Sequence, residues 1–298
     1  PKKLASLGFG KRATPAEKAQ VIQMLRQEFS LTILLDIAQL PRATFYYHLK
    51  RMKQVDKYET AKQEITAIYH ENKGRYGYRR ITDVLHSRGF AVNHKTVQRL
   101  MKELGLICRV RIKKYRSYKG EVGKVAPNLL NRDFNADRPN QKWVTDISYI
   151  KTLQGTLYLS IIRDLYDNSI VAYQTGTGQN NQLVLNTIRK AKRKEGVTAE
   201  LQLHSDQGFQ YTSHGYFKLT QAYGITPSMS RKGNPYDNAP AENFFSILKT
   251  ECIYRTKLSS FEEARSIIDE YIYFYNYQRI QTRTKLTPME LRCQFLNS

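Results

Sequence analysis

The sequence predicts an α/β domain with a mixed five-stranded sheet and flanking helices, preceded by small all-α units. From about residue 140, three strand-like runs follow one another, and helices and strands then alternate. Residues 14–106 instead carry helix starts, break signals and apolar residues at helical spacing. Charge divides similarly: residues 1–124 hold 27 Lys and Arg against 10 Asp and Glu, a balance of +17, and residues 125–298 hold 21 against 16, a balance of +5. Such a basic region is typical of nucleic-acid binding, although a merely solvated basic surface has the same composition.

Residues 14–51 are predicted to form a first helical unit. The stretch Thr14-Pro-Ala-Glu17 combines a capping threonine, a proline at the first helical position and a glutamate at the third. We expect one apolar face from Val21, Leu25 and Phe29. A second apolar segment, 31–38, is followed by a Leu-Pro break and a polar, aromatic helix over 43–50. This order fits a helix-turn-helix, and a plain three-helix packing module would look similar.

A second helical unit is predicted over residues 57–106. Its middle helix opens at 74–81, and its last helix begins at the capping residue Asn93 and runs to about Leu104. The side chains expected to face the core are Val97, Leu100, Met101 and Leu104. Those expected to face outward, as on a recognition helix, are His94, Lys95, Gln98 and Arg99. Gln and Arg read base edges and Lys binds phosphate, so we predict DNA contact there.

A basic segment follows, with six cations in the eleven positions 109–119 and two tyrosines between them. We predict that it tracks a DNA backbone, and a solvated tether between domains is the alternative. Binding through several phosphates would weaken steeply with salt. The predicted DNA contacts in this segment are Arg109, Arg111, Lys113, Lys114 and Arg116.

The region after residue 140 has the element order of a ribonuclease-H-like sheet: three antiparallel strands, then alternating helices and strands. Strands are predicted over 143–150, 157–162, 170–173, 201–204 and 225–227, and helices over 182–194 and 213–223. In this order the first and fourth strands lie side by side. Asp146 is on the first strand and Asp206 follows the fourth, so we expect the two carboxylates to meet.

A third acidic residue, Glu242, lies in the first turn of a helix predicted to begin near Asn238, with Pro240 in the same turn. Lys249 follows seven residues later, almost two full turns, and therefore shares its face. Hard divalent cations take oxygen ligands, and a pair of them can hold both the attacking and the leaving oxygen of a phosphodiester. Three acids in so basic a chain therefore predict a metal site for DNA chemistry.

Several stretches resemble one family in particular. They are Trp143 to Ile150, His204 to Ser213, Met229 to Glu251, Tyr273 to Arg279 and Leu286 to Glu290. In these stretches the chain resembles a DDE transposase of the insertion-sequence-three family. The resemblance is to the second-frame (OrfB-type) protein of that family, which has a retroviral-integrase-like catalytic core. The likeness covers about residues 57–298, with weaker matching over 14–51.

The resemblance implies that Asp146, Asp206 and Glu242 are the catalytic and metal-binding triad and that Lys249 positions DNA. It also implies two Mg²⁺ ions per site, for which Mn²⁺ would substitute. Water would be the nucleophile for nicking and a 3′-hydroxyl the nucleophile for joining. Recognition of terminal inverted repeats and a circular intermediate are implied as well.

The predicted division of the chain has four parts. Residues 1–55 and 56–108 are two helix-turn-helix DNA-binding units, 109–127 a basic linker and 128–298 the catalytic domain. Family members usually act as a frameshift fusion with an upstream segment, and this chain opens Pro1-Lys2-Lys3 and has no sustained heptad. We therefore expect it to be the downstream portion of a longer protein.

Other side chains have weaker signals. Asp164 starts a probable turn, and His204 shares strand parity with Asp206; both are expected to be structural. A loop before the catalytic helix is predicted to contact DNA through Arg231, Lys232 and Asn234, with loop ordering as the alternative. Core packing, rather than base stacking, is expected for the aromatic residues of a late helix, Tyr271, Tyr273, Phe274, Tyr275 and Tyr277.

The sequence also bounds partners and location. It has no apolar run of about 18 residues, so no membrane partner is expected, and the three distant cysteines indicate neither a disulfide framework nor a zinc site. We expect a cytoplasmic, nucleoid-associated bacterial protein that binds double-stranded DNA at transposon ends and target. Because two ends must be held together, a homo-oligomer of at least two copies is expected. The rival functions are a non-catalytic DNA-binding regulator and a ribonuclease-H-type nuclease acting on RNA–DNA hybrids.

Overall fold

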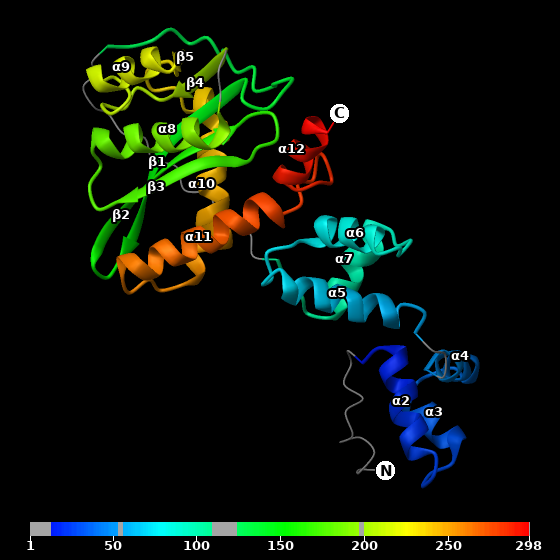
Figure 1. Cartoon of the computed structure of the whole chain (residues 1–298). Coiled ribbons are helices and arrows are strands. Elements are labelled where there is room, and N and C mark those ends of the chain that lie inside the picture. The colour runs from blue at the N-terminus through cyan, green and yellow to red at the C-terminus, as the bar shows by residue number, and fades with distance from the viewer. Residues whose placement is uncertain (1–12, 53–55, 109–123, 197–199, 298) are drawn as a thin grey trace. The chain divides into compact units, whose positions relative to one another are not determined.

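The computed structural model describes residues 13–52, 56–108, 124–196 and 200–297 (Figure 1). It divides into two compact units, Pro1–Ala67 and Ile68–Ser298. The predicted Arg109, Arg111, Lys113, Lys114 and Arg116 lie outside the described residues. The four-part functional division of the sequence stays a prediction.

The first unit contains α2 (Pro15–Leu25), α3 (Leu31–Ala38), α4 (Arg42–Met52) and the start of α5 (Glu59–Glu71). The predicted cap is confirmed, because Thr14 and Glu17 form a reciprocal capping box. The expected apolar face is wrong for Phe29, which lies beyond the end of α2 at Leu25 and is 39% exposed, whereas Leu25 packs against the core of this unit. The core is formed instead by Ala19, Ile22, Leu34, Ala38, Leu40 and Phe45.

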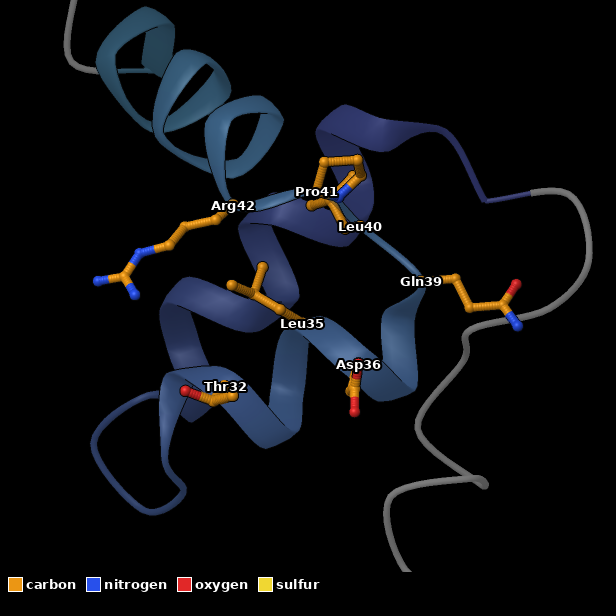
Figure 2. A pocket seen from close by; sticks show the side chains of 7 residues that line it. All are labelled: Thr32, Leu35, Asp36, Gln39, Leu40, Pro41 and Arg42. Carbon is orange, nitrogen blue, oxygen red and sulfur yellow. The ribbon is translucent and has the colours of Figure 1, made fainter.

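A shallow hollow of about 450 Å³ lies at the turn between α3 and α4 (Figure 2). The turn reverses at Gln39, which adopts the left-handed conformation with φ 49°. Pro41 then precedes the first residue of α4, Arg42, whose side chain extends away from the turn in Figure 2. The unit thus has the helix, turn and helix that the sequence predicted.

The second unit begins with the end of α5 and continues through α6 (Tyr78–Ser87) and α7 (His94–Glu103). Asn93 caps α7 by accepting a hydrogen bond from the Lys95 amide, as predicted. Val97, Leu100 and Met101 are buried as expected. Leu104 is not, because it is the residue that ends the helix and is 37% exposed.

The sheet contains β1 (Lys142–Thr152), β2 (Gly155–Asp164), β3 (Ile170–Gly176), β4 (Leu201–Ser205) and β5 (Ile225–Met229). Its order is β3-β2-β1-β4-β5, with β1 antiparallel to β2 and parallel to β4. This is the predicted ribonuclease-H-like mixed sheet, and β1 is its central strand.

Both faces of β1 are covered, which follows from side-chain alternation along a strand. Trp143 packs into the cluster formed with α8 (Asn181–Glu195) and α9 (His214–Ala222). Its neighbour Val144 points the other way and packs against Ala241 of α10 (Ala239–Glu251). Asp146 has the same parity as Val144, so it belongs to the face that α10 covers (Figure 1).

After the sheet, the short 3₁₀ turns η1 (Pro235–Asn238) and η2 (Ile253–Arg255) flank α10, and α11 (Phe261–Tyr277) and α12 (Pro288–Leu296) follow. Core packing of the α11 aromatics is found for Tyr271, Phe274 and Tyr275. It was wrong for Tyr273 and Tyr277, which lie four residues apart on the opposite face, 58% and 48% exposed, with their rings stacked.

Arg292 of α12 connects this helix to the sheet domain, because its side chain is buried among three carboxylates. It lies 3.4 Å from Asp164, 2.7 Å from Asp167 and 2.6 Å from Glu195. Asp164 also accepts hydrogen bonds from the amides of residues 140 and 166, so its structural role is as expected. Among the described residues, no helix is long and apolar enough to cross a membrane.

Candidate active site

The register of two parallel strands brings the first two acidic residues together. Val144 of β1 pairs with His204 of β4, and Asp146 and Asp206 each lie two residues further along. Asp206 follows Ser205, the last residue of β4, and its charge raises the pKa of Asp146, so the two carboxylates lie close together where the two strands adjoin. The predicted juxtaposition follows from this register.

The third acidic residue enters from α10. Asn238 ends the 3₁₀ turn η1, Pro240 occupies the first turn of α10, and Glu242 follows in that turn, as predicted. The N-terminal end of a helix favours a nearby negative charge. Ala241 fixes this end of the helix, because it is fully buried against Val144 of the central strand.

Backbone amides orient the two strand carboxylates. The Ile147 amide donates to Asp146 Oδ1 at 2.7 Å, and the Gly208 amide donates to Asp206 Oδ1 at 2.9 Å. A Cβ atom at position 208 would lie 3.0 Å from Asp206 Oδ1 and 3.1 Å from Gln210 Oε1. Glycine therefore lets the loop approach Asp206 this closely without displacing either side chain.

The three acids are electrostatically coupled. Burial raises the pKa of Asp146 well above its usual range, and the charges of Asp206 and Glu242 raise it further. Burial also raises the pKa of Asp206, and burial followed by the charge of Asp206 raises the pKa of Glu242. Their mutual repulsion would be relieved by a cation placed among them.

The donor chemistry of this site fits a hard divalent cation, because all three side chains present carboxylate oxygens. Within the described residues, however, no group of three or more His, Cys, Asp or Glu side chains is positioned to hold a metal ion as it stands. Asp206 and Glu242 are exposed side chains, whereas Asp146 is half-buried. Because Glu242 is exposed at the start of α10, its carboxylate has room to turn toward an ion beside Asp146 and Asp206.

The protein supplies one cation of its own near the carboxylates. Lys249, in the last turn of α10, lowers the pKa of Asp146. Its ammonium also lies 4.8 Å from the ring centroid of Tyr149, an exposed residue of β1. The ammonium of Lys151 lies 5.7 Å from the same centroid. Two lysine ammonium groups, those of Lys249 and Lys151, therefore lie around Tyr149 near the acidic site.

Two features of the site were missed by sequence reasoning. Tyr211 is buried, its hydroxyl lies 3.3 Å from Thr145 Oγ1, and burial and the charges of Asp146 and Asp206 raise its pKa well above the usual range. A neutral hydroxyl thus lies next to the acidic pair. The only signal in the sequence was its place five residues after Asp206.

The second missed feature is the buried carboxylate of Asp237, which organises the loop before α10. Arg231 donates to it through Nε and Nη2, both at 2.8 Å, and Arg132 donates through Nε at 2.9 Å. The Arg231 bond holds the pKa of Asp237 well below its usual range. Asn234 caps η1 through the Tyr236 amide. Arg231 and Asn234 therefore order the loop, which was the alternative to DNA contact in the sequence analysis. DNA contact by Arg231, Lys232 and Asn234 stays a prediction.

His204 is a packed residue, as expected. It is fully buried, with Nδ1 2.8 Å from Ser228 Oγ and Nε2 3.1 Å from Ser230 Oγ. Burial lowers its pKa to about 4, so the ring is neutral near pH 7. It links β4 to β5 and the loop that leads to α10.

The predicted DNA-reading side chains of α7 are all on its solvent face. His94, Lys95, Gln98 and Arg99 are exposed. The Arg99 guanidinium pairs with Glu103 one turn away, and the His94 ring stacks at 6.2 Å on Tyr78. This exposed face is compatible with entry into a DNA groove, which stays a prediction.

Comparison with known proteins agrees with this fold. Residues 57–114 match a family model described as an HTH-like domain, and residues 136–235 and 242–296 match two described as integrase core domains. The putative transposase InsK for insertion sequence element IS150 of Escherichia coli K12 is 47% identical over 276 residues, 92% of this chain and 98% of the relative. Transposase InsF for insertion sequence IS3A of the same organism is 32% identical, covering 84% and 89%. The HTLV-2 integrase catalytic core domain in complex with magnesium superposes with a TM-score of 0.44 and 14% identity, covering 52% of this chain and 98% of that one.

The chain has a ribonuclease-H-like sheet, and its residues 136–235 and 242–296 match integrase core domains. Together these features define a polynucleotidyl transferase with an integrase-type core. The identity to IS150 and IS3 transposases over most of both chains goes further, and the chain belongs to the insertion-sequence-three family of DDE transposases. The predicted fold class, family and transposase activity are thereby confirmed.

Proposed function

We propose that this transposase nicks the terminal inverted repeats of a bacterial insertion sequence and joins the resulting 3′ ends to new DNA, using Asp146, Asp206 and Glu242. The observation that carries the proposal is the Val144–His204 register of the parallel strands β1 and β4, because Asp146 and Asp206 each follow this pair by two residues. The charge of Asp206 raises the pKa of both Asp146 and Glu242, as expected for three acids that lie close together, and this supports the proposal.

The three carboxylates would hold divalent metal, Mg²⁺ in the first instance with Mn²⁺ as a substitute, and a two-ion site is proposed. When bound, the metal would activate the nucleophilic oxygen and stabilise the leaving oxyanion. Asp146 and Asp206 are held by backbone amides, so they would orient the site, and Glu242 would complete it from α10. Lys249 would bind a phosphate next to the reacting one.

DNA would be held by the helical units and the basic segment. We propose base contacts from His94, Gln98 and Arg99 and phosphate contacts from Lys95 on α7. Further phosphate contacts are proposed for the cations of 109–116 and for Arg231, Lys232 and Asn234. Because two transposon ends must be joined, the active form is proposed to be a homo-oligomer of at least two copies, acting at the bacterial nucleoid.

Replacement of single carboxylates tests the catalytic assignment. Asp146→Asn and Glu242→Gln should each lower Mg²⁺-dependent nicking of a terminal-repeat duplex by about 1000-fold, the rate equivalent of several kcal/mol of transition-state stabilisation. Binding of the same duplex in a metal-free buffer should stay close to wild type. Glu262→Gln is the matched control, because Glu262 is also an exposed acid in the first turn of a helix. Nicking by the Glu242→Gln protein at the wild-type rate would remove Glu242 from the site.

A thermal measurement tests metal binding without activity. Mg²⁺ or Mn²⁺ should raise the unfolding temperature of the wild-type protein and raise it less in Asp146→Asn, since ligand binding stabilises only the state that binds.

An RNA–DNA hybrid should not be cut under conditions in which the terminal-repeat duplex is nicked. Preferential cutting of the hybrid would favour a ribonuclease instead.

A further inference from the structure

We propose that a buried docking joint between the second helical unit and the carboxyl end of α10 fixes the distance from the DNA-reading helix α7 to the active site, and so determines where the DNA is cut. The joint consists of Arg75, Tyr76 and Arg80 on one side and Glu251 and Arg279 on the other. This inference rests on the proposed function, since it assigns α7 to end recognition and α10 to catalysis.

Tyr76 and Arg80 hold the backbone that follows α11. The Tyr76 hydroxyl donates to the Gln278 carbonyl at 2.9 Å and accepts from the Ile280 amide at 3.0 Å, and the residue is 1% exposed. Arg80 Nε donates to the Ile280 carbonyl at 2.9 Å. The two side chains thus satisfy three backbone groups in a segment that forms no regular structure of its own.

The centre of the joint is the carboxylate of Glu251, the last residue of α10. Arg279 donates two hydrogen bonds to it, at 2.7 and 2.9 Å, and the Tyr271 hydroxyl donates a third at 2.8 Å. The Arg80 guanidinium lies 4.0 Å away. Although burial raises the pKa of Glu251, the bonds from Arg279 and Tyr271 outweigh it, and the pKa is lowered. Loss of one partner from a buried charge set of this kind is strongly destabilising, because it leaves an uncompensated buried charge.

Arg75 covers the end of the same helix. Its Nε donates to the Glu251 carbonyl at 3.3 Å, and its guanidinium lies 4.5 Å from the Phe274 ring centroid. A cation at the carboxyl end of a helix also complements the helix dipole. At the edge of the joint, Lys285 binds both carboxylate oxygens of Asp83, at 2.8 and 2.9 Å.

These contacts connect the proposed DNA reader to the proposed catalytic residues by stiff elements. Helix α6, which carries Arg80, leads to α7 through a short connection, and both helices bury apolar residues. Glu242 and Glu251 are nine residues apart on one helix, which spans roughly 13 Å. Placing α7 at a given base sequence would therefore place Glu242 at a fixed distance along the DNA. A loosened joint should leave base recognition intact but make the position of the nick variable.

The first experiment weakens the joint from the helical side. Tyr76→Phe and Arg80→Gln are compared with Arg79→Gln, which removes the same charge from the adjacent, exposed position of α6. An end-labelled duplex of the element's own terminal repeat is nicked in Mg²⁺, and the cut positions are read at single-nucleotide resolution. We expect wild type and Arg79→Gln to cut at one position. Arg80→Gln should spread its cuts over neighbouring positions and cut about 10- to 100-fold more slowly, as misplacement of about 1 Å can cause.

Binding of the same duplex should change by less than about threefold in the joint variants, because the side chains of α7 are untouched. A single cut position at the wild-type rate in both Tyr76→Phe and Arg80→Gln would overturn the proposal. So would a loss of duplex binding that accounts for the whole loss of rate. Asp146→Asn separates the two levels of inference: if that variant still nicks, the catalytic assignment fails while the positions of the cuts still test the joint.

A charge exchange decides the matter if Arg80→Gln does not fold. Asp83 and Lys285 form an ion pair across the joint, and the Asp83 side chain is only 14% exposed. Asp83→Lys and Lys285→Asp each place like charges together and should broaden the cut positions. The double variant restores the attraction in reverse and should return the cuts to one position. If the double variant cuts as broadly as the single variants, the contact does not set the register.

Discussion

The Asn238 side chain connects the catalytic helix directly to the central strand: its Nδ2 donates to the Thr145 carbonyl at 3.2 Å. Thr145 immediately precedes Asp146, and Asn238 immediately precedes α10, which carries Glu242. Asn238 is 3% exposed, so water does not compete for this bond. Together with the packing of Ala241 against Val144, this bond therefore fixes the approach of Glu242 to Asp146.

Asn238→Ala should lower the nicking rate by about 10- to 100-fold, because catalysis is sensitive to displacements of about 1 Å. The cost in stability should be about 1–3 kcal/mol, because the change removes one partner of a buried hydrogen bond. Asn243→Ala, at an exposed position of the same helix, is the control. Nicking kinetics and thermal unfolding distinguish the outcomes: a rate loss explained entirely by unfolding would argue against a positioning role.

The contact between Tyr149 and Lys249 predicts coupling between the two side chains. The Lys249 ammonium lies 4.8 Å from the Tyr149 ring centroid and its charge lowers the pKa of Asp146. Such a cation–π contact at a partly exposed site is worth about 0.5–1 kcal/mol. Tyr149→Leu should therefore slow nicking about two- to fivefold, whereas Tyr149→Phe, which keeps the ring, should retain most of the rate. The decisive measurement is the double-variant cycle: in a Lys249→Gln background, Tyr149→Leu should have no further effect.

The exposed face of α7 predicts two different losses. Gln98→Ala should weaken discrimination between the terminal repeat and a base-substituted repeat by about 1–3 kcal/mol, if Gln98 reads a base edge. Lys95→Gln should weaken binding to both duplexes equally and lower the slope of log affinity against log salt by about 0.9. Binding titrations at several salt concentrations test both. Equal loss on both duplexes for Gln98→Ala would contradict base reading there.

The sequence predicted the parts of the site that depend on local signals. The order of the elements predicted that the strands before Asp146 and Asp206 lie side by side. The helix-start signals predicted that Glu242 lies in the first turn of a helix. The sequence missed pairings between distant segments, such as Asp237 with Arg132, because periodicity reports which face is buried and not which partner lies opposite. Phe29 was misassigned for the related reason that a regular spacing does not reveal where a helix ends.

The docking joint shows the same limit. The stretch 74–81 was read only as a helix start, yet Tyr76 and Arg80 make contacts about 200 residues away in the sequence. Nothing local distinguishes such an arginine from a DNA-binding one, because both are basic residues on a polar helix face. Only burial and partner geometry separate the two roles.

Removal of Arg292 should produce a pH-dependent loss of stability. Arg292 neutralises Asp164, Asp167 and Glu195, and burial followed by the charge of Asp167 raises the pKa of Asp164 to about 6. A carboxyl whose folded pKa lies above its unfolded value binds more protons in the folded state, so stability falls as pH rises from about 4 to 6.

Arg292→Met removes the opposing cation, raises the folded pKa values further and should cost about 3–5 kcal/mol at pH 7. The cost should shrink at pH 5, where the carboxyls take up protons. Thermal unfolding at the two pH values measures this, with Arg193→Met at an exposed position of α8 as control. An equal loss at both pH values would show that Arg292 acts through packing alone.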